Sequence, residues 1–121
     1  MLKTGVVSDR RYLKHFAGRS HPERPERIAA MIEMAESLTR PDLKMMAPRE
    51  ATHEEIASCH TPEYVATMAR TASLDRFDFD PDTHSSRDTY ETALLSAGGV
   101  LTAVEAVKPP GPPASQPTEN K

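Results

Sequence analysis

Apolar positions along the chain fall into short blocks that predict two strands in its first half. Segment 4–8 contains adjacent β-branched residues, and segment 43–47 is a short apolar run bounded by prolines, as is typical of strands. Between them, apolar residues recur at helical spacing over 25–38, with Pro25 suited to the first turn and Pro41 just beyond the end. The order strand, helix, strand favours an α/β fold that opens with a parallel sheet.

The second half of the chain predicts three more helices. Thr52 and Glu55 have the spacing of a capping box, which predicts a short helix through about residue 59. Thr61 followed by Pro62 marks the start of the next helix. The longest helix is predicted to follow Ser86 as its cap and to end near residue 107. Its buried face is expected to carry Tyr90, Ala93, Leu94, Ala97, Leu101 and Val104.

Two glycines interrupt this longest helix. Each of Gly98 and Gly99 destabilises a helix by about 1 kcal/mol relative to alanine, so the pair indicates close approach of another segment. Segments 9–20 and 73–86 are polar and are predicted to be loops. Two strands cannot cover the apolar faces of four helices, and the sequence therefore predicts the opening part of a domain.

Composition narrows the class of protein. The 121 residues fit one domain, and a net charge of −3 with scattered bases argues against nucleic-acid binding. The one cysteine excludes an internal disulfide and a cysteine-rich zinc site. No apolar stretch has the length of a membrane span or the pattern of a signal peptide, so we expect no membrane partner and a cytoplasmic location.

Composition changes sharply after residue 107. Segment 108–121 contains five prolines in its fourteen residues, and it offers little to bury. We therefore predict an ordered part over 1–107 and a disordered, proline-rich tail over 108–121.

Five segments, in order and with consistent spacing, carry a resemblance to a known family. They are TGVV at 4–7, HPERPERI at 21–28, CHTPEYV at 59–65, DPDTH at 80–84 and YETALLSAGGVL at 90–101. Together they resemble the N-terminal part of the histone-deacetylase-like family, which includes acetoin-utilisation and acetylpolyamine amidohydrolase proteins. The resemblance is nearest to the bacterial, class-II-like branch. It implies an incomplete arginase/deacetylase fold, in which helices flank a parallel sheet.

The resemblance also implies a chemistry that this chain does not contain in full. In the family, zinc polarises an amide carbonyl and a pair of adjacent histidines acts as general base and acid, with a tyrosine at the oxyanion. The histidines of this chain are His15, His21, His53, His60 and His84, and none are adjacent. We therefore predict no catalytic residue, no metal ligand and no cofactor in this chain, zinc being the cofactor of the full-length family.

One short motif imitates the family's zinc ligands. Residues 82–84 spell Asp-x-His, but they precede the longest helix, whereas the family's ligands follow a sheet strand and the histidine pair. Zinc needs three protein ligands, and no second cluster is present to join this motif. Two interpretations stay open: a plain loop that leads to Ser86 as the helix cap, or, as the family resemblance implies, a loop at the pocket rim that contacts substrate.

The resemblance places seven residues at the substrate rim or the internal cavity. They are His21, Pro22, Glu23, Arg24, Arg27, Asp82 and Thr83. Arg27 matches an arginine that lines the cavity beneath the metal in relatives, where a guanidinium attracts a carboxylate. For residues 21–26 the alternative is a helix entrance without a site role, and for Arg27 it is an ion pair with an acid on the helix.

Taken together, the sequence predicts a truncated N-terminal segment of a zinc-dependent amidohydrolase that is itself inactive. Acetylated lysine or a similar amine would be a substrate only of a full-length form, and a complementing C-terminal fragment is the expected partner. The alternative is a non-enzymatic helical interaction module or a decayed gene product. Three causes of the expected truncation remain open: a frameshift near residues 109–113, a domain cut, or gene decay.

Overall fold

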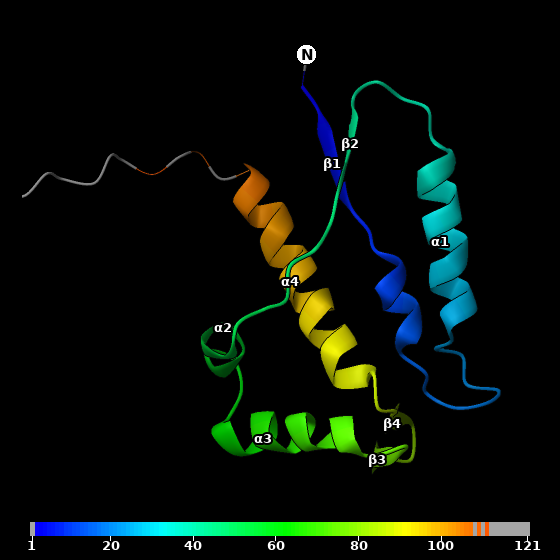
Figure 1. Ribbon diagram of the computed structural model, residues 1–121, viewed down its shortest axis with the longest axis vertical. Helices are drawn as coiled ribbons and strands as arrows, with labels where there is room; N and C mark the ends of the chain where they lie inside the picture. The colour runs from blue at the N-terminus through cyan, green and yellow to red at the C-terminus, as the bar shows by residue number, and fades with distance from the viewer. Residues whose placement is uncertain (1, 108, 110, 112–121) are drawn as a thin grey trace, which may run out of the picture.

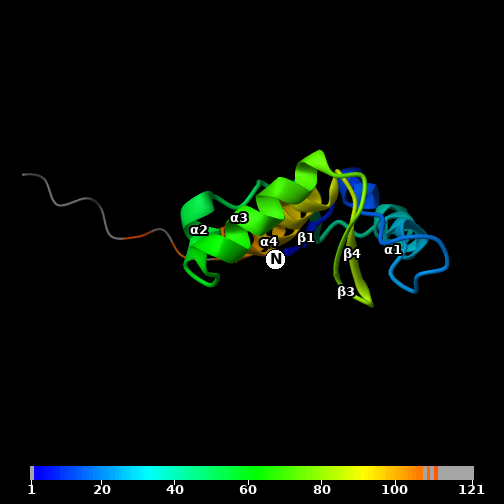
Figure 2. The same cartoon turned by 90° about the horizontal axis from the view of Figure 1, so that it is seen from below.

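A two-stranded parallel sheet lies between α1 on one side and α4 on the other (Figures 1 and 2). The computed structural model describes residues 2–107, 109 and 111. Its elements are β1 (Thr4–Val7), the 3₁₀ helix η1 (Arg10–Lys14), α1 (Pro25–Ser37), β2 (Leu43–Met46), α2 (His53–Ala57), α3 (Pro62–Arg70), the 3₁₀ helix η2 (Thr71–Ser73), β3 (Phe77–Asp80), β4 (Thr83–Ser85) and α4 (Thr89–Val107).

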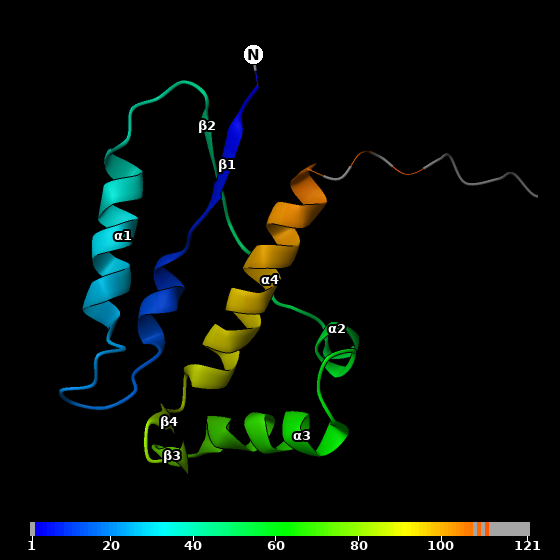
Figure 3. The ribbon, with the colours of Figure 1, turned by 180° about the vertical axis from the view of Figure 1, so that it is seen from behind.

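The sheet confirms the predicted parallel pairing. β1 and β2 align from Thr4 opposite Leu43 to Val7 opposite Met46, and α1 forms part of the crossover between them. α3 crosses the lower end of α4, and the antiparallel β3–β4 hairpin lies beside it (Figure 3). The helix starts at Pro25 and Pro62 are confirmed, and Thr52 and Glu55 form the predicted capping box.

The buried face of α4 differs from the prediction. Thr92, Leu95, Gly98 and Gly99 are its buried residues, whereas Val104 of the predicted face is 51% exposed. Apolar periodicity misplaced the face because the closest contact is made at glycines, which add nothing to an apolar pattern. The buried face of α4 is therefore rotated about the helix axis relative to the predicted one, and Ala93 of the predicted face borders an open groove instead of the core.

Gly98 lies where α4 touches the loop after β2, which confirms the predicted close approach. A Cβ at this position would lie 1.7 Å from Arg49 O and 2.7 Å from Ala51 N. The backbone N–H of Ala51 donates to Leu94 O at 3.0 Å, so the loop is hydrogen-bonded to α4 at the same place.

A cluster of ion pairs centred on Arg49 also holds the loop after β2 in place. The Arg49 guanidinium donates to both carboxylate oxygens of Glu55, at 2.7 and 2.8 Å, and to Glu105 Oε1 at 2.6 Å. The Arg49 contacts lower the pKa of Glu55 to about 2, and backbone donation from Thr52 adds to the shift. The same two carboxylates raise the pKa of Arg49. The cluster therefore ties α2, the loop and the end of α4 together.

Two segments predicted to be loops contain regular structure. Within 9–20, η1 forms with Asp9 as its cap, because Asp9 accepts the Arg11 backbone N–H. Within 73–86, alternating Phe77 and Phe79 form β3, which pairs with β4. The start of α4 also corrects a prediction: Ser86 lies three residues before the helix, and its backbone N–H donates to Thr89 Oγ1 at 2.8 Å.

The predicted tail over 108–121 lies outside the described residues, except for positions 109 and 111, so the domain division stays a prediction. Among the residues that the structure describes, none of the helices combines the length and apolar character needed to cross a membrane.

Candidate functional site

An open groove lies at the carboxyl end of β1, between the start of α1, η1 and one side of α4. Its volume is about 780 Å³. Val7, Ile28, Ala93 and Val100 give it an apolar lining. Ligands of open α/β sheets bind outside the carboxyl ends of the strands, so this groove is the candidate site.

Three of the predicted site residues lie on one wall of the groove. Glu23, Arg24 and Arg27 line it from the entrance and first turn of α1. Within the described part of the chain, the guanidinium groups of Arg24 and Arg27 make no hydrogen bond or ion pair. A guanidinium is a planar fork of donors suited to carboxylate or phosphate. This wall therefore offers a place for an anionic or polar group, although the roles assigned to the three residues stay predictions.

Two aromatic residues that the sequence analysis did not select line the groove, Tyr12 from η1 and His15 from the position just after η1. The Tyr12 hydroxyl donates to Leu95 O on α4 at 3.1 Å, and burial raises the pKa of Tyr12. His15 Nδ1 contacts Thr89 Oγ1 at 2.9 Å. Both side chains connect η1 to α4. The capping position of Asp9 was the signal that could have identified η1, and with it these two residues.

His21 lies at the edge of this region and connects the α1 entrance to the β3–β4 hairpin. Its Nδ1 accepts the Glu23 backbone N–H at 3.0 Å, and its Nε2 lies 3.0 Å from Asp82 O. A neutral imidazole with Nδ1 as acceptor carries its proton on Nε2, so His21 donates to Asp82. The Asp82 carboxylate is also 3.3 Å from Nε2 but is 92% exposed. The structure thus brings His21 and Asp82 together, away from the groove lining.

The remaining two predicted residues lie outside the groove. Thr83 donates its hydroxyl to Asp80 Oδ2 at 3.0 Å within the hairpin turn, and Pro22 is exposed beside His21. The seven residues therefore form two groups. Glu23, Arg24 and Arg27 form the groove wall at the start of α1. His21 and Pro22, with Asp82 and Thr83 of the hairpin, form a second group that we call the latch.

The Asp82–Thr83–His84 motif does not form a metal site. His84 Nδ1 donates to Asp78 Oδ1 at 2.7 Å, while His21 contacts Asp82. The Arg76 side chain, together with His84, lowers the pKa of Asp78. Throughout residues 2–107, no three His, Cys, Asp or Glu side chains are grouped so that they would hold a metal ion. Since zinc requires such a ligand set, the described residues do not fit a zinc site.

Comparison with known proteins identifies one family. The sequence pattern described as "Histone deacetylase domain" matches residues 21–111. A probable deacetylase of Archaeoglobus fulgidus is 33% identical over 107 residues, which cover 86% of this chain and 30% of that protein. Histone deacetylase 15 of Arabidopsis thaliana is 34% identical over 102 residues, covering 78% of this chain and 18% of that protein.

A solved structure is similar over nearly the whole chain. The crystal structure of the HDA15 HD domain superposes with a TM-score of 0.73 and 30% sequence identity. The superposition covers 90% of this chain and 36% of that domain. The chain thus spans about a third or less of the length of these similar proteins.

Proposed function

Since the chain belongs to the histone deacetylase family, we propose that it is the N-terminal segment of a zinc-dependent amidohydrolase and does not itself hydrolyse amides. Its fold is an incomplete arginase/deacetylase fold, with helices on both sides of a parallel sheet. Relatives are named "Probable deacetylase" and "Polyamine deacetylase HDAC10". These names support acetylated lysine or an acetylated amine as the substrate class of the complete enzyme.

The proposal rests chiefly on the composition of the groove. The groove lies where a substrate would bind, and the side chains of Arg24 and Arg27 on its wall can bind a polar or anionic group. The described residues nevertheless offer no group of metal ligands, and the sequence has no adjacent histidine pair. The chain's part in the activity is therefore to form one wall of the site and its rim.

Zinc, when bound in such an enzyme, supplies a Lewis acid for the carbonyl and an activated water. The residues described here do not fit a site for it, so their contribution is binding and orientation. We assign the groove wall to Glu23, Arg24 and Arg27. We assign the rim to His21 and Pro22, with Asp82 and Thr83 on the hairpin.

Two assays on the purified chain test the proposal. Hydrolysis of an acetyl-lysine peptide and of an acetylated diamine is measured with and without added zinc, and the probable deacetylase of Archaeoglobus fulgidus is assayed in parallel. Zinc affinity is measured by competition with a chromogenic chelator, and His84→Ala serves as a matched variant. We expect no hydrolysis of either substrate. We also expect the zinc affinity of the chain to be the same as that of the His84→Ala variant. Zinc-dependent hydrolysis by the chain alone would overturn the proposal.

A non-enzymatic interaction module is the second candidate. It is favoured by large apolar side chains that face solvent, among them Met31 at 61% and Met34 at 55% exposure on α1. A cooperative thermal melt of the chain alone, unchanged by zinc, would favour this module. A weak, non-cooperative melt would favour a segment that needs the rest of a domain. The cytoplasmic location stays a prediction from the sequence.

A further inference from the structure

His21 connects the groove wall to the hairpin, through one ring nitrogen on each side. Its Nδ1 accepts the backbone N–H of Glu23 at 3.0 Å, and its Nε2 lies 3.0 Å from Asp82 O and 3.3 Å from the Asp82 carboxylate. A backbone N–H can only donate, so Nδ1 must keep its lone pair to accept this bond. The double contact therefore requires a neutral imidazole whose proton is on Nε2.

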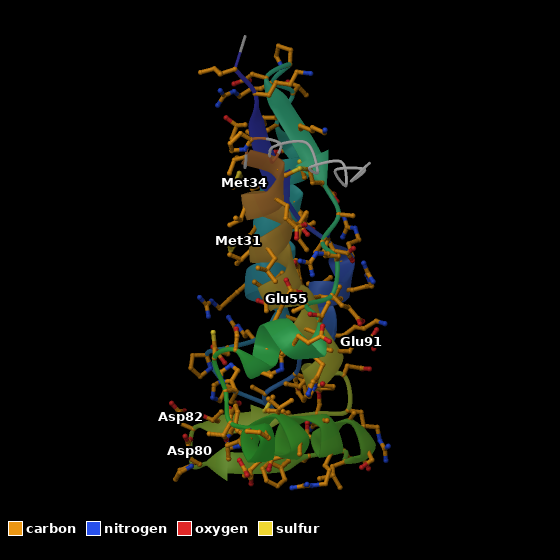
Figure 4. The ribbon with its side chains drawn as sticks, turned by 90° about the vertical axis from the view of Figure 1, so that its left-hand side faces the viewer. Met31, Met34, Glu55, Asp80, Asp82 and Glu91 are labelled. Carbon is orange, nitrogen blue, oxygen red and sulfur yellow. The ribbon has the colours of Figure 1, made fainter. Side chains whose placement is uncertain are left out.

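Three carboxylates of the hairpin lie near the His21 and His84 rings and favour charged imidazoles. They belong to Asp78, Asp80 and Asp82. Asp80 and Asp82 lie side by side at the outer edge of the molecule, where the Asp82 N–H donates to Asp80 Oδ1 at 2.8 Å (Figure 4). The Asp82 carboxylate faces His21, and Asp78 Oδ1 accepts from His84 Nδ1 at 2.7 Å. Carboxylates this close stabilise a protonated imidazole.

Positive charges near the rings act in the opposite direction. The Nη2 atom of Arg76 lies 3.3 Å from His84 Nδ1. His21 and His84 pack edge to face with 5.7 Å between the ring centroids, and each side chain is only 12% exposed, so two charged rings would repel each other. Along the chain, the nearest charged residues to His21 are Arg19 and Glu23, which carry opposite charges. A proton gained by His21 therefore changes the contacts of a largely buried ring.

The loop before His21 has a conformation that costs free energy. Ser20 has a φ of 60°, in the left-handed region, and Gly18 has a φ of 121°. A residue other than glycine stays in this region only when its surroundings hold it there. The loop also lies against the hairpin, because a Cβ on Gly18 would be 3.4 Å from Arg76 Nη1. The loop can therefore relax when His21 loses its contact with Glu23.

We propose that His21 is a proton-dependent switch that uncouples the groove wall from the hairpin. The neutral ring holds Glu23 and Asp82 together. A proton on Nδ1 turns this nitrogen into a donor that faces the Glu23 N–H, a second donor, so this contact breaks. The contact of Nε2 with Asp82 persists, because the carboxylate then pairs with a cation. Histidine changes charge between about pH 5 and 8, and Glu23 and Arg24 lose their connection to the hairpin as the pH falls through this range.

His84 is a matched control, since its geometry tolerates a second proton. Its Nδ1 donates to Asp78 Oδ1, and a further proton adds to Nε2, which leaves this contact in place. Arg76, together with His84, lowers the pKa of Asp78, so this acceptor stays ionised over the same range. A proton therefore breaks a hydrogen bond at His21 and preserves the one at His84.

A nuclear magnetic resonance titration of the full chain from about pH 8 to pH 5.5 tests the switch. We expect the Glu23 amide proton signal to move upfield as the pH falls, with the same midpoint as the ring C–H signals of His21. The Asp82 amide signal should move far less, because hydrogen bonds from Asp82 and Thr83 lower the pKa of its acceptor, Asp80. A Glu23 signal that does not move would overturn the proposal. A spectrum without dispersion at pH 8 would also overturn it, because the switch requires the fold.

Two substitutions assign the effect to one ring. His21→Asn places a carbonyl oxygen near the position of Nδ1 and does not ionise, so the Glu23 signal should become independent of pH. His84→Asn removes the other imidazole and should leave the Glu23 titration in place. A titration that survives in His21→Asn, or that His84→Asn abolishes, would contradict the proposal. These outcomes do not depend on hydrolysis, so the switch and the proposed function can fail separately.

Discussion

Replacement of Gly98 by alanine is predicted to destabilise the fold, because α4 meets the loop after β2 at this residue. The added Cβ would lie 1.7 Å from Arg49 O and 2.7 Å from Ala51 N, and both are backbone atoms. The loop would have to move away from α4 to relieve the clash. That movement breaks the hydrogen bond from the Ala51 N–H to Leu94 O.

Three contributions set the size of the effect. Alanine gains about 1 kcal/mol over glycine in a helix interior. Overpacking at a tight contact destabilises by roughly 1–3 kcal/mol, and a lost backbone hydrogen bond by about 1 kcal/mol. The net loss is about 2 kcal/mol, which for a chain of this length lowers Tm by roughly 8 °C.

Urea unfolding followed by circular dichroism measures this loss. Gly99→Ala is an informative neighbour, because its added Cβ would meet the Tyr12 hydroxyl at 2.5 Å, a side-chain atom that can move. Ser96→Ala, at an exposed position of α4, is the control for helix propensity. We expect Gly98→Ala to lose most stability, Gly99→Ala less, and Ser96→Ala none. A Gly98→Ala variant at least as stable as the original chain would refute the packing argument.

Three other predictions follow from named contacts. Because the pKa of Glu55 is lowered from 4.5 to about 2, this carboxylate stabilises the fold above about pH 4.5 and less as the pH falls toward 2. Glu55→Gln should therefore flatten the pH dependence of unfolding free energy across that window, and an unchanged profile would argue against the Arg49 pairing. Thr52→Ala removes the hydroxyl that accepts the Glu55 N–H and should lose about 1 kcal/mol in urea unfolding, whereas Thr52→Ser should retain most of it. His21→Ala removes the contact to Asp82 O and should speed hydrogen exchange at the hairpin turn, with α3 unaffected as the internal control; unchanged exchange there would show that the latch does not hold the hairpin.

Local signals in the sequence predicted most of the regular elements. Pro25, Pro62 and the Thr52–Glu55 capping box start helices through backbone geometry and hydrogen bonds that belong to the segment itself. The parallel sheet followed from the order of elements. These features could be predicted because short-range interactions determine them.

What the sequence did not predict depends on contacts between distant segments. The orientation of α4 is set by Gly98 against the loop at Arg49, which an apolar pattern cannot reveal. The many acids of segment 73–86 favour a loop, but Phe77 and Phe79 alternate with these acids as in a strand, and the segment forms a hairpin. The position of Tyr12 in the groove depends on its hydrogen bond to the carbonyl of Leu95 on α4, which is 83 residues away in the sequence.

The roles of the candidate site residues stay predictions, and the sequence did not predict how these residues are arranged. The resemblance selected seven residues, and the fold separates them into the groove wall on α1 and the latch between His21 and the hairpin. Spacing along the chain could not show this separation, because it depends on how the hairpin packs beside the α1 entrance.

The most direct test of the account is to sequence the coding DNA beyond codon 121 and translate it in all three frames. If the chain derives from a deacetylase-like enzyme, one frame should encode the adjacent histidine pair followed by an Asp-x-His motif. A downstream sequence without these motifs in any frame would contradict the account and favour an independent interaction module.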